Sequence, residues 1–236
     1  MSQAPTNTSI LNTQIVFQGF RALLPLCFFV AVFGAAFAVA AQQIALSDSA
    51  IVLMSAALFA GASQFAALEF WGDSSALLPL CLTVLAINAR HLLMGATLYP
   101  QLKQLPVLQR YAVMILASDA NWALANAALQ RGEAALGLLL GGGLALWLFW
   151  VIGTGAGLYL GSVLAAPHAL GLDMVMSCFL LCMLLKGERD VRTACIWLVA
   201  GTSSLLAYTY LPDNSHVIVG TLCGGLLGAL WQEDTQ

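Results

Sequence analysis

Eight apolar stretches dominate this sequence, and a membrane-spanning helix needs about 20 apolar residues. Short polar connectors separate the stretches, which cover residues 21–41, 50–68, 76–99, 111–129, 134–164, 170–185, 194–210 and 217–231. A chain exposed to lipid must satisfy its own backbone hydrogen bonds, and the alternating pattern of a membrane strand is absent. The sequence therefore predicts an all-α fold, a polytopic membrane helix bundle of seven or eight hydrophobic segments.

Composition and charge favour the same class of protein. Of the 236 residues, 61% are hydrophobic and 8% are charged, whereas charged residues average about 25% in soluble domains. The net charge of −3 offers no basic surface for nucleic acid. We predict polar tails at 1–18 and 232–236 around a single transmembrane domain at 19–231. The first tail lacks the charged region of a cleaved signal peptide, so the first stretch is expected to remain as a span.

The number of complete crossings is left open by the distribution of basic residues. These residues cluster before the first stretch, between the third and fourth, and between the sixth and seventh. The positive-inside rule places all three clusters in the cytoplasm, but simple alternation forbids this. Either the charge rule is weak here or one segment does not cross. The short stretch 170–185 fits a half-span, and 134–164 is broken by Gly141-Gly142-Gly143, so the predicted bundle includes a broken or re-entrant helix as an alternative.

A faint internal repeat fits such a layout. Residues 34–70 and 157–185 both contain a glycine-bearing helix, a turn with an acid (Asp48 or Asp173) and a further apolar helix. Repeats with interrupted helices near the membrane midplane are common in secondary transporters. Chance similarity between apolar sequences is the alternative.

Arg90 is the residue that most requires an explanation, because it lies deep inside the third stretch. A charge at the centre of a membrane helix costs roughly 2.5 to 3.5 kcal/mol, so it needs a partner or a wet cavity. Arg90 and Asp119 lie at similar distances from the connector between the third and fourth stretches, roughly 12 to 14 Å along each helix. An antiparallel pair of helices would bring them to one depth. We predict that they pair, either as a structural ion pair or as part of a binding site whose guanidinium also meets a carboxylate.

Polar neighbours extend this candidate site. Asn88 and His91 cannot share one helix face with Arg90, so they are expected to make other contacts. Histidine changes charge near neutral pH, so His91 is a candidate for a proton pathway, with a simple packing role as the alternative. Asn121 and Trp122 follow Asp119 and could recognise an ammonium group and line an apolar pocket.

Three further polar residues are weaker candidates. Ser63 and Gln64 lie among small residues in the second stretch, where they could contact a ligand or simply hydrogen-bond a neighbouring helix. Asp173 precedes most of the sixth stretch and could be an acid at a helix N-terminus. We include all three in the predicted substrate-binding or coupling set.

Two glycine series predict close helix packing. Glycines four residues apart lie on one helix face and allow another backbone to approach. The predicted docking faces comprise Gly153, Gly157 and Gly161, and Gly220, Gly224 and Gly228. Their partner is either a helix of the same chain or a second subunit.

Signatures of catalysis and of metal binding are missing. The six cysteines lie in apolar stretches without paired Cys or His spacing, so neither a disulfide framework nor a metal site is predicted. No HExxH sequence and no phosphate-binding GK[ST] loop is present. We expect no enzymatic activity and no cofactor, and any uphill transport would draw on an ion gradient or on another subunit.

Several short motifs, in order and at matching intervals, resemble the AzlC family. They are Gly19-Phe20 to Pro25, Phe33-Gly34, Phe59-Ala-Gly-Ala-Ser-Gln-Phe65, Asn88-Ala-Arg-His91 with Leu98-Tyr-Pro100, Ser118-Asp119 and Gly171-Leu-Asp173. The resemblance extends from about residue 19 to 231, nearly the whole chain. One departure is Ala120, which stands where that family usually has a second acid. Asp119 is then the single acid at this place.

The resemblance implies a permease of the bacterial cell inner membrane. It would be the large subunit of a two-component exporter of L-valine and related branched-chain amino acids, working with a small AzlD-type membrane subunit. Our hypothesis is secondary, proton-coupled alternating access with the ligand near Arg90 and Asp119. The competing class is an ion or solute channel, or a structural subunit of a membrane complex in which these two residues form a structural ion pair.

Overall fold

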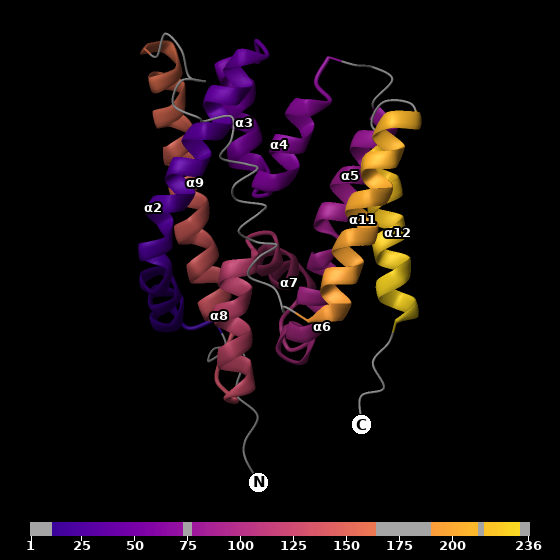
Figure 1. The fold of residues 1–236 in the computed structure, drawn as a ribbon. Helices are drawn as coiled ribbons and strands as arrows, with labels where there is room; N and C mark the ends of the chain where they lie inside the picture. Colours follow the sequence, from indigo (N-terminus) through magenta and orange to yellow (C-terminus); the bar gives the residue numbers. More distant parts are fainter. Residues whose placement is uncertain (1–10, 73–76, 164–189, 212–214, 232–236) are drawn as a thin grey trace. The chain divides into compact units, whose positions relative to one another are not determined.

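The computed structural model describes residues 11–72, 77–163, 190–211 and 215–231. Most of these residues are helical, with no strand among them. The helices are α2 (Thr13–Gln43), α3 (Asp48–Ala57), α4 (Gly61–Glu69), α5 (Leu77–Asn88), α6 (Arg90–Leu102), α7 (Val107–Met114), α8 (Asp119–Gln130), α9 (Leu136–Val163), α11 (Val191–Tyr210) and α12 (Ser215–Leu230) (Figure 1). The predicted all-α class is confirmed.

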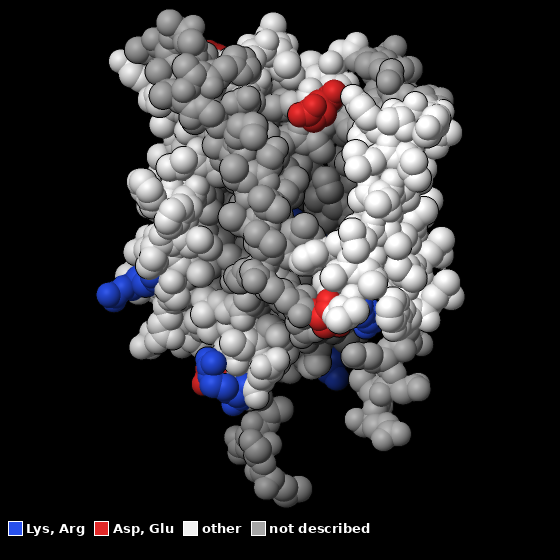
Figure 2. Space-filling view, viewed as in Figure 1, with Lys and Arg blue, Asp and Glu red and all other residues white. Residues whose placement is uncertain are grey.

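Within the described ranges, four stretches are long and apolar enough to cross a membrane. They are Thr13–Gln43, Leu77–Leu102, Leu136–Gly161 and Val191–Tyr210. Figure 2 shows that most of the described surface on one face carries neither Lys, Arg, Asp nor Glu, as expected of a surface that meets lipid. The count of seven or eight segments remains a prediction, because the whole sixth stretch lies outside the described residues.

The chain separates into two compact units. One comprises residues 1–68 and 88–175 and contains α2 to α4 and α6 to α9. The other comprises residues 69–87 and 176–236 and contains most of α5 together with α11 and α12. All of the described residues discussed below as a candidate site belong to the first unit.

The first unit is organised around α2 and α9, which lie side by side (Figure 1). They run in the same direction, because Gly19 of α2 lies against Leu138 at the beginning of α9, and Gly157 near its end lies against Ala35. Glycines on both helices bring the two backbones into contact along this interface. The first glycine series therefore docks α9 on α2 within this chain, with Gly153 against Ala31 and Gly161 against the Gln42 side chain.

A side chain added at this interface should destabilise the protein. A Cβ at Gly153 would lie 2.7 Å from the Ala31 Cα, whereas one at Gly155 meets nothing within 4 Å. We expect Gly153→Leu to lower the free energy of unfolding by about 1–3 kcal/mol or more, since overpacking displaces backbone. Thermal unfolding in detergent would measure the change. Gly155→Leu is the matched control, and equal destabilisation by both variants would contradict the packing described here.

The Gly141-Gly142-Gly143 sequence does not break a helix, which corrects one of the sequence-based alternatives. α9 is continuous from Leu136 to Val163. A Cβ at Gly143 would lie 2.5 Å from the Leu116 carbonyl oxygen, and one at Gly142 would lie 2.7 Å from a Leu23 methyl group. Gly141 lies against the backbone of Val16. The three glycines thus let α2 and the segment before α8 approach the same part of α9.

The second apolar stretch does not cross as one helix, although the sequence predicted a single apolar run at 50–68. It consists of α3 and α4, interrupted at residues 58–60. Along α3, Asp48 lies near Gln42 at the end of α2, and Ser55 accepts a hydrogen bond from Thr154 of α9. α4 then turns back, since Gly61 lies against Trp150 and Phe65 stacks on Phe33. We call this element the α3–α4 hairpin.

The fourth stretch also folds back on itself instead of crossing. It consists of α7 and α8, interrupted at residues 115–118. A buried cluster joins this element to α6 and to the beginning of α9: Leu98, Leu102, Leu105, Val113, Ala117, Ala125, Ala128, Ala135, Leu136 and Leu139. Both ends of the pair lie at the same end of α9, and the interruption contacts Gly143 further along it. We call this element the α7–α8 hairpin.

These two re-entrant hairpins explain part of the charge distribution that simple alternation could not accommodate. Lys103 lies in the connector between α6 and α7, and Arg110 lies in the first turn of α7. Arg131 directly follows α8. All three lie at the end of the unit where α9 begins. At the opposite end of this unit, the connectors that the structure describes carry no Lys or Arg. The positive-inside rule assigns the basic end to the cytoplasm.

The second unit contains a pair of packed helices, α11 and α12 (Figure 1). The second glycine series faces α11 within this chain, because a Cβ at Gly220 or Gly224 would meet Ser204 or Ala200 within 3 Å, and one at Gly228 would lie 3.5 Å from Ile196. Asp190 caps α11 by accepting a hydrogen bond from the Thr193 amide, and Thr193 holds the pKa of that carboxyl below its usual value.

Candidate functional site

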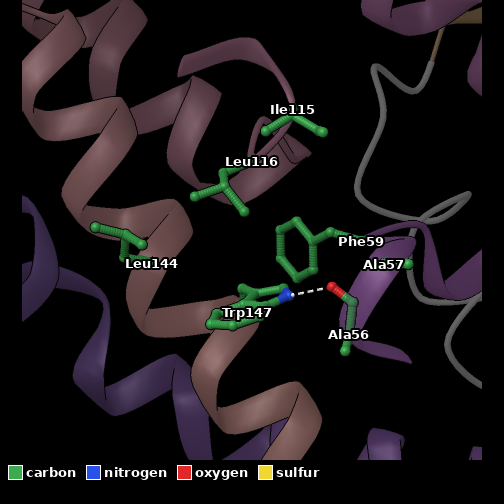
Figure 3. Close-up of a pocket in the computed structure, with 7 residues that line it drawn as sticks. All are labelled: Ala56, Ala57, Phe59, Ile115, Leu116, Leu144 and Trp147. Carbon is green, nitrogen blue, oxygen red and sulfur yellow. Dashed lines mark hydrogen bonds between the residues drawn. The ribbon is translucent and has the colours of Figure 1, made fainter. Parts of the chain in front are cut away.

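The interruptions of the two hairpins meet beside α9. A cavity of about 240 Å³, open on one side, lies between them. Its lining comes from the α3–α4 hairpin, the α7–α8 hairpin and α9: Ala56, Ala57, Phe59, Ile115, Leu116, Leu144 and Trp147 (Figure 3). We call it the tip pocket. Trp147 spans it and donates a hydrogen bond from Nε1 to the Ala56 carbonyl at 3.1 Å.

The tip pocket lies well inside the expected membrane thickness. Its α9 residues, Leu144 and Trp147, stand roughly 12 to 17 Å from the beginning of a 28-residue helix that is roughly 42 Å long. The half-helices α3, α4 and α7 have 10, 9 and 8 residues, too short to cross a hydrocarbon core of about 30 Å. Non-helical backbone at this depth is tolerated where it is buried in protein or lines a water-filled cavity.

Arg90 and Asp119 form the predicted ion pair. Arg90 Nη1 donates to Asp119 Oδ2 at 2.6 Å. The route to this pair differs from the predicted one, because Asp119 is the first residue of α8, directly after the interruption of the α7–α8 hairpin. α6 and α8 then run in the same direction, with Trp122 Nε1 donating to Thr97 Oγ1 further along.

A helix N-terminus and a partly exposed surface surround this ion pair. Asp119 stands at the N-terminus of α8, where the helix dipole favours an anion. The side chains of Arg90 and Asp119 remain 34% and 43% exposed in the chain. A charge pair at this depth cannot face hydrocarbon without a large cost. Its exposed side therefore faces water or another polypeptide.

Asn88, Ser63 and Gln64 continue the polar surroundings towards α4. Asn88, the last residue of α5, donates from Nδ2 to Ser63 Oγ at 2.7 Å. Gln64 is 1% exposed, and neither polar atom of its amide has a hydrogen-bond partner among the described residues. A buried amide without partners is costly, so Gln64 is a polar group that a ligand or a rearrangement could satisfy.

His91 links the α5–α6 junction to the α7–α8 hairpin. Its Nδ1 lies 3.1 Å from the Asn88 carbonyl oxygen, and its Nε2 lies 3.3 Å from the Ala117 carbonyl oxygen. The structure therefore places it between two helix interruptions.

The side chain of Asn121 is fully used in hydrogen bonds to neighbouring residues of the protein. It is fully buried, its Oδ1 accepts from the backbone N–H and hydroxyl of Ser118, and its Nδ2 donates to the carbonyls of Leu116 and Leu139. These contacts form a capping box for α8 and fasten the α7–α8 hairpin to α9. We assign Asn121 to the support of the site.

The predicted aromatic wall lies elsewhere than expected. Trp122 packs on the buried cluster between α6, α8 and α9 and does not line the tip pocket. Phe59 and Trp147 line the pocket instead. Sequence reasoning missed Trp147 because nothing polar marks it within its apolar stretch. Asp173 lies outside the described residues.

No group of three or more His, Cys, Asp or Glu side chains in the described ranges is arranged to hold a metal ion. The described cysteines are free thiols.

Comparison with known proteins finds a matching family model and similar membrane proteins. Residues 25–164 match the model of the family described as AzlC protein, a range that includes both hairpins and α9. The inner membrane protein YgaZ of Escherichia coli K12 is 27% identical over 98% of this chain and 97% of its own length. An uncharacterized membrane protein of Archaeoglobus fulgidus is 30% identical over 83% of this chain and 85% of its own length. No solved structure matches the chain.

The match covers more than half of the chain and includes the described candidate site residues from Ser63 to Trp122. The family resemblance and the inner-membrane localisation predicted from the sequence are both confirmed. The chain is a multi-pass inner-membrane protein and belongs to the AzlC family.

Proposed function

We propose that this protein exports L-valine and related branched-chain or apolar amino acids by a secondary, proton-coupled alternating-access mechanism. It would act as the large subunit of an exporter with a small AzlD-type membrane subunit, and it would perform no chemical conversion itself. One observation carries the proposal: a half-buried ion pair lies three residues along the chain from an apolar pocket, where two re-entrant hairpins meet. Interrupted helices at mid-depth are a common way to build a transporter site.

The charges suit a zwitterion with a carboxylate. Arg90 and Asp119 cancel each other, but the N-termini of α4 and α8 each add roughly half a positive charge near the interruptions. An incoming carboxylate would meet this positive balance and the guanidinium of Arg90, while the ammonium group would meet Asp119. Gln64, whose buried amide lacks partners among the described residues, would supply a further hydrogen bond when the hairpins rearrange.

The tip pocket suits the side chain of such a ligand. It is lined by aliphatic and aromatic residues, and Leu116 of its lining is three residues from Asp119. Its volume of about 240 Å³ is below the range of roughly 300–1,000 Å³ that holds drug-sized ligands. A small apolar side chain fits this volume and character.

Efflux from cells that lack their own exporters tests the proposal. The chain is expressed alone and with an AzlD-type small membrane protein, and efflux of L-valine is compared with efflux of L-glutamate. We expect valine efflux from the pair, dependent on the proton gradient. Gradient-insensitive flux that does not saturate would instead indicate a channel, and valine retention by cells with both subunits correctly inserted would contradict the proposal.

The size of the tip pocket should set the selectivity. Ala57→Leu adds bulk to its lining and should disfavour leucine and isoleucine relative to alanine by roughly tenfold, since one methylene group in a hydrophobic pocket changes discrimination by about 10–200-fold. Competition assays with each amino acid would measure this shift. Ala127→Leu is the matched control, because Ala127 is exposed on α8 and does not line the pocket.

A further inference from the structure

His91 makes two contacts that a neutral imidazole cannot satisfy together. Both partners, the carbonyl oxygens of Asn88 and Ala117, can only accept hydrogen bonds. A neutral ring carries one N–H, so it donates to one carbonyl and turns a lone pair towards the other. An imidazolium carries two N–H groups and donates to both. The observed arrangement therefore fits the protonated ring.

The two carbonyls belong to parts of the chain that a transport cycle would have to separate. Asn88 is at the junction of α5 and α6, and Ala117 is in the interruption of the α7–α8 hairpin, one residue after Leu116 of the tip pocket. The Ala117 contact is the one that holds the hairpin to α6. A neutral ring that keeps its proton on Nδ1, bonded to the Asn88 carbonyl oxygen, turns the Nε2 lone pair towards the Ala117 carbonyl oxygen and loosens the hairpin. Proton binding at His91 and the position of the hairpin are thus coupled through these two hydrogen bonds.

The charged residues near His91 do not compete with it for the proton. Among the described residues, Arg90 precedes His91 on α6, and it is paired with Asp119 of α8 at 2.6 Å. α9 contains no Asp, Glu, Lys, Arg or His, and in α4 the acid Glu69 stands at the end far from Ser63. α7 contributes Arg110 and Tyr111, which lie near its beginning, away from Ala117.

We propose that His91 is the proton-binding residue of this transporter and acts as a clamp: its protonated form ties the α7–α8 hairpin to the α5–α6 junction, and its neutral form releases the hairpin. The proton comes from bulk water on one side of the membrane and returns to bulk water on the other, and no bond other than N–H forms or breaks. This inference rests on the proposed transport function only for its role in coupling. Proton binding and the clamp are properties of the protein without substrate.

Hydrogen exchange of the full-length protein in lipid nanodiscs tests the clamp. Exchange of the peptide around residues 112–122 is followed at pH 5.5 and pH 8.5, corrected for the intrinsic pH dependence of exchange. We expect about tenfold stronger protection at pH 5.5, since one tethering hydrogen bond is lost at high pH. His91→Gln should remove this difference. His216→Gln, which changes a histidine of α12 that lies edge-to-face with Tyr208 of α11, should leave it unchanged.

A second measurement keeps the test decisive if His91→Gln does not fold. In the His168→Gln/His216→Gln background His91 is the remaining histidine, and nitrogen NMR of its labelled ring reports the protonation state directly. We expect both nitrogens to carry protons at pH 5.5 and only one at pH 8.5. A neutral ring at pH 5.5, or a hairpin equally protected at both pH values, would overturn the proposal. Neither hydrogen exchange nor nitrogen NMR requires an amino acid substrate, so a failed valine efflux assay would not affect these results.

Discussion

Arg90→Gln and Asp119→Asn are each expected to abolish valine efflux and to destabilise the protein. Each single change leaves one charge unpaired inside the membrane, which costs about 3–5 kcal/mol when the pair is buried, and less where the remaining charge reaches water. Thermal unfolding in detergent and efflux from cells would measure the two effects separately.

The double variant Arg90→Gln/Asp119→Asn distinguishes a binding site from a structural ion pair. It contains no unpaired charge, so its thermal stability should return towards that of the wild type. Efflux should remain absent, because the zwitterion has lost both of its charge partners. Full efflux from the double variant would show that the pair only holds α6 and α8 together. Arg131→Gln is the control, because Arg131 pairs with Glu133 on the exposed connector after α8.

Asn121→Leu is expected to destabilise the α7–α8 hairpin by about 2–4 kcal/mol. Leucine has a similar volume but leaves the Leu116 and Leu139 carbonyls without their donor and Ser118 without its acceptor. Asn121 is fully buried, so water cannot replace these hydrogen bonds. Thermal unfolding, together with proteolysis near residues 115–118, would detect the loosened interruption.

Asn126→Leu provides the matched control for this change. Asn126 lies on the same helix and is only partly buried. Unfolding temperatures that fall equally for both variants would contradict the role assigned to Asn121.

The Arg90–Asp119 pair could be predicted from sequence because the cost of a buried charge and the spacing of the two residues were enough to connect them. A buried arginine demands a partner, and the nearest acid across one connector was Asp119. The path between them could not be predicted in the same way. Hydropathy measures how apolar a segment is and how long it is, but not whether the segment turns back, so the stretches at 50–68 and 111–129 looked like single runs.

One of the two turns had a readable signal. Ser118 and Asn121 have the spacing of a capping box, which marks the beginning of a helix, yet they were interpreted only as a polar patch. The α3–α4 interruption at 58–60 contains Leu, Phe and Ala and offers no comparable signal apart from Gly61. Packing against Trp147 and Trp150 of α9 accompanies that turn, and such contacts cannot be read from a single sequence.

Glycines misled the prediction in the opposite sense. Gly141-Gly142-Gly143 looked like a helix break because glycine is a poor helix former in water. In a membrane the helix keeps its backbone hydrogen bonds, and the missing side chains serve close packing instead. The same reasoning explains why the glycine series of α9 faces α2 and that of α12 faces α11 within this chain.

The most direct test of the central claim, that an apolar amino acid binds where the two hairpins meet, is ligand protection of the tip pocket. Leu116→Cys is introduced after the six native cysteines are replaced, and the reaction of the new thiol with a thiol reagent is followed in nanodiscs containing both subunits. We expect L-valine to slow the labelling of this thiol in a saturable manner and L-glutamate to leave its rate unchanged. Labelling at an unchanged rate in saturating valine, by a protein that still exports valine, would place the substrate elsewhere and contradict the claim.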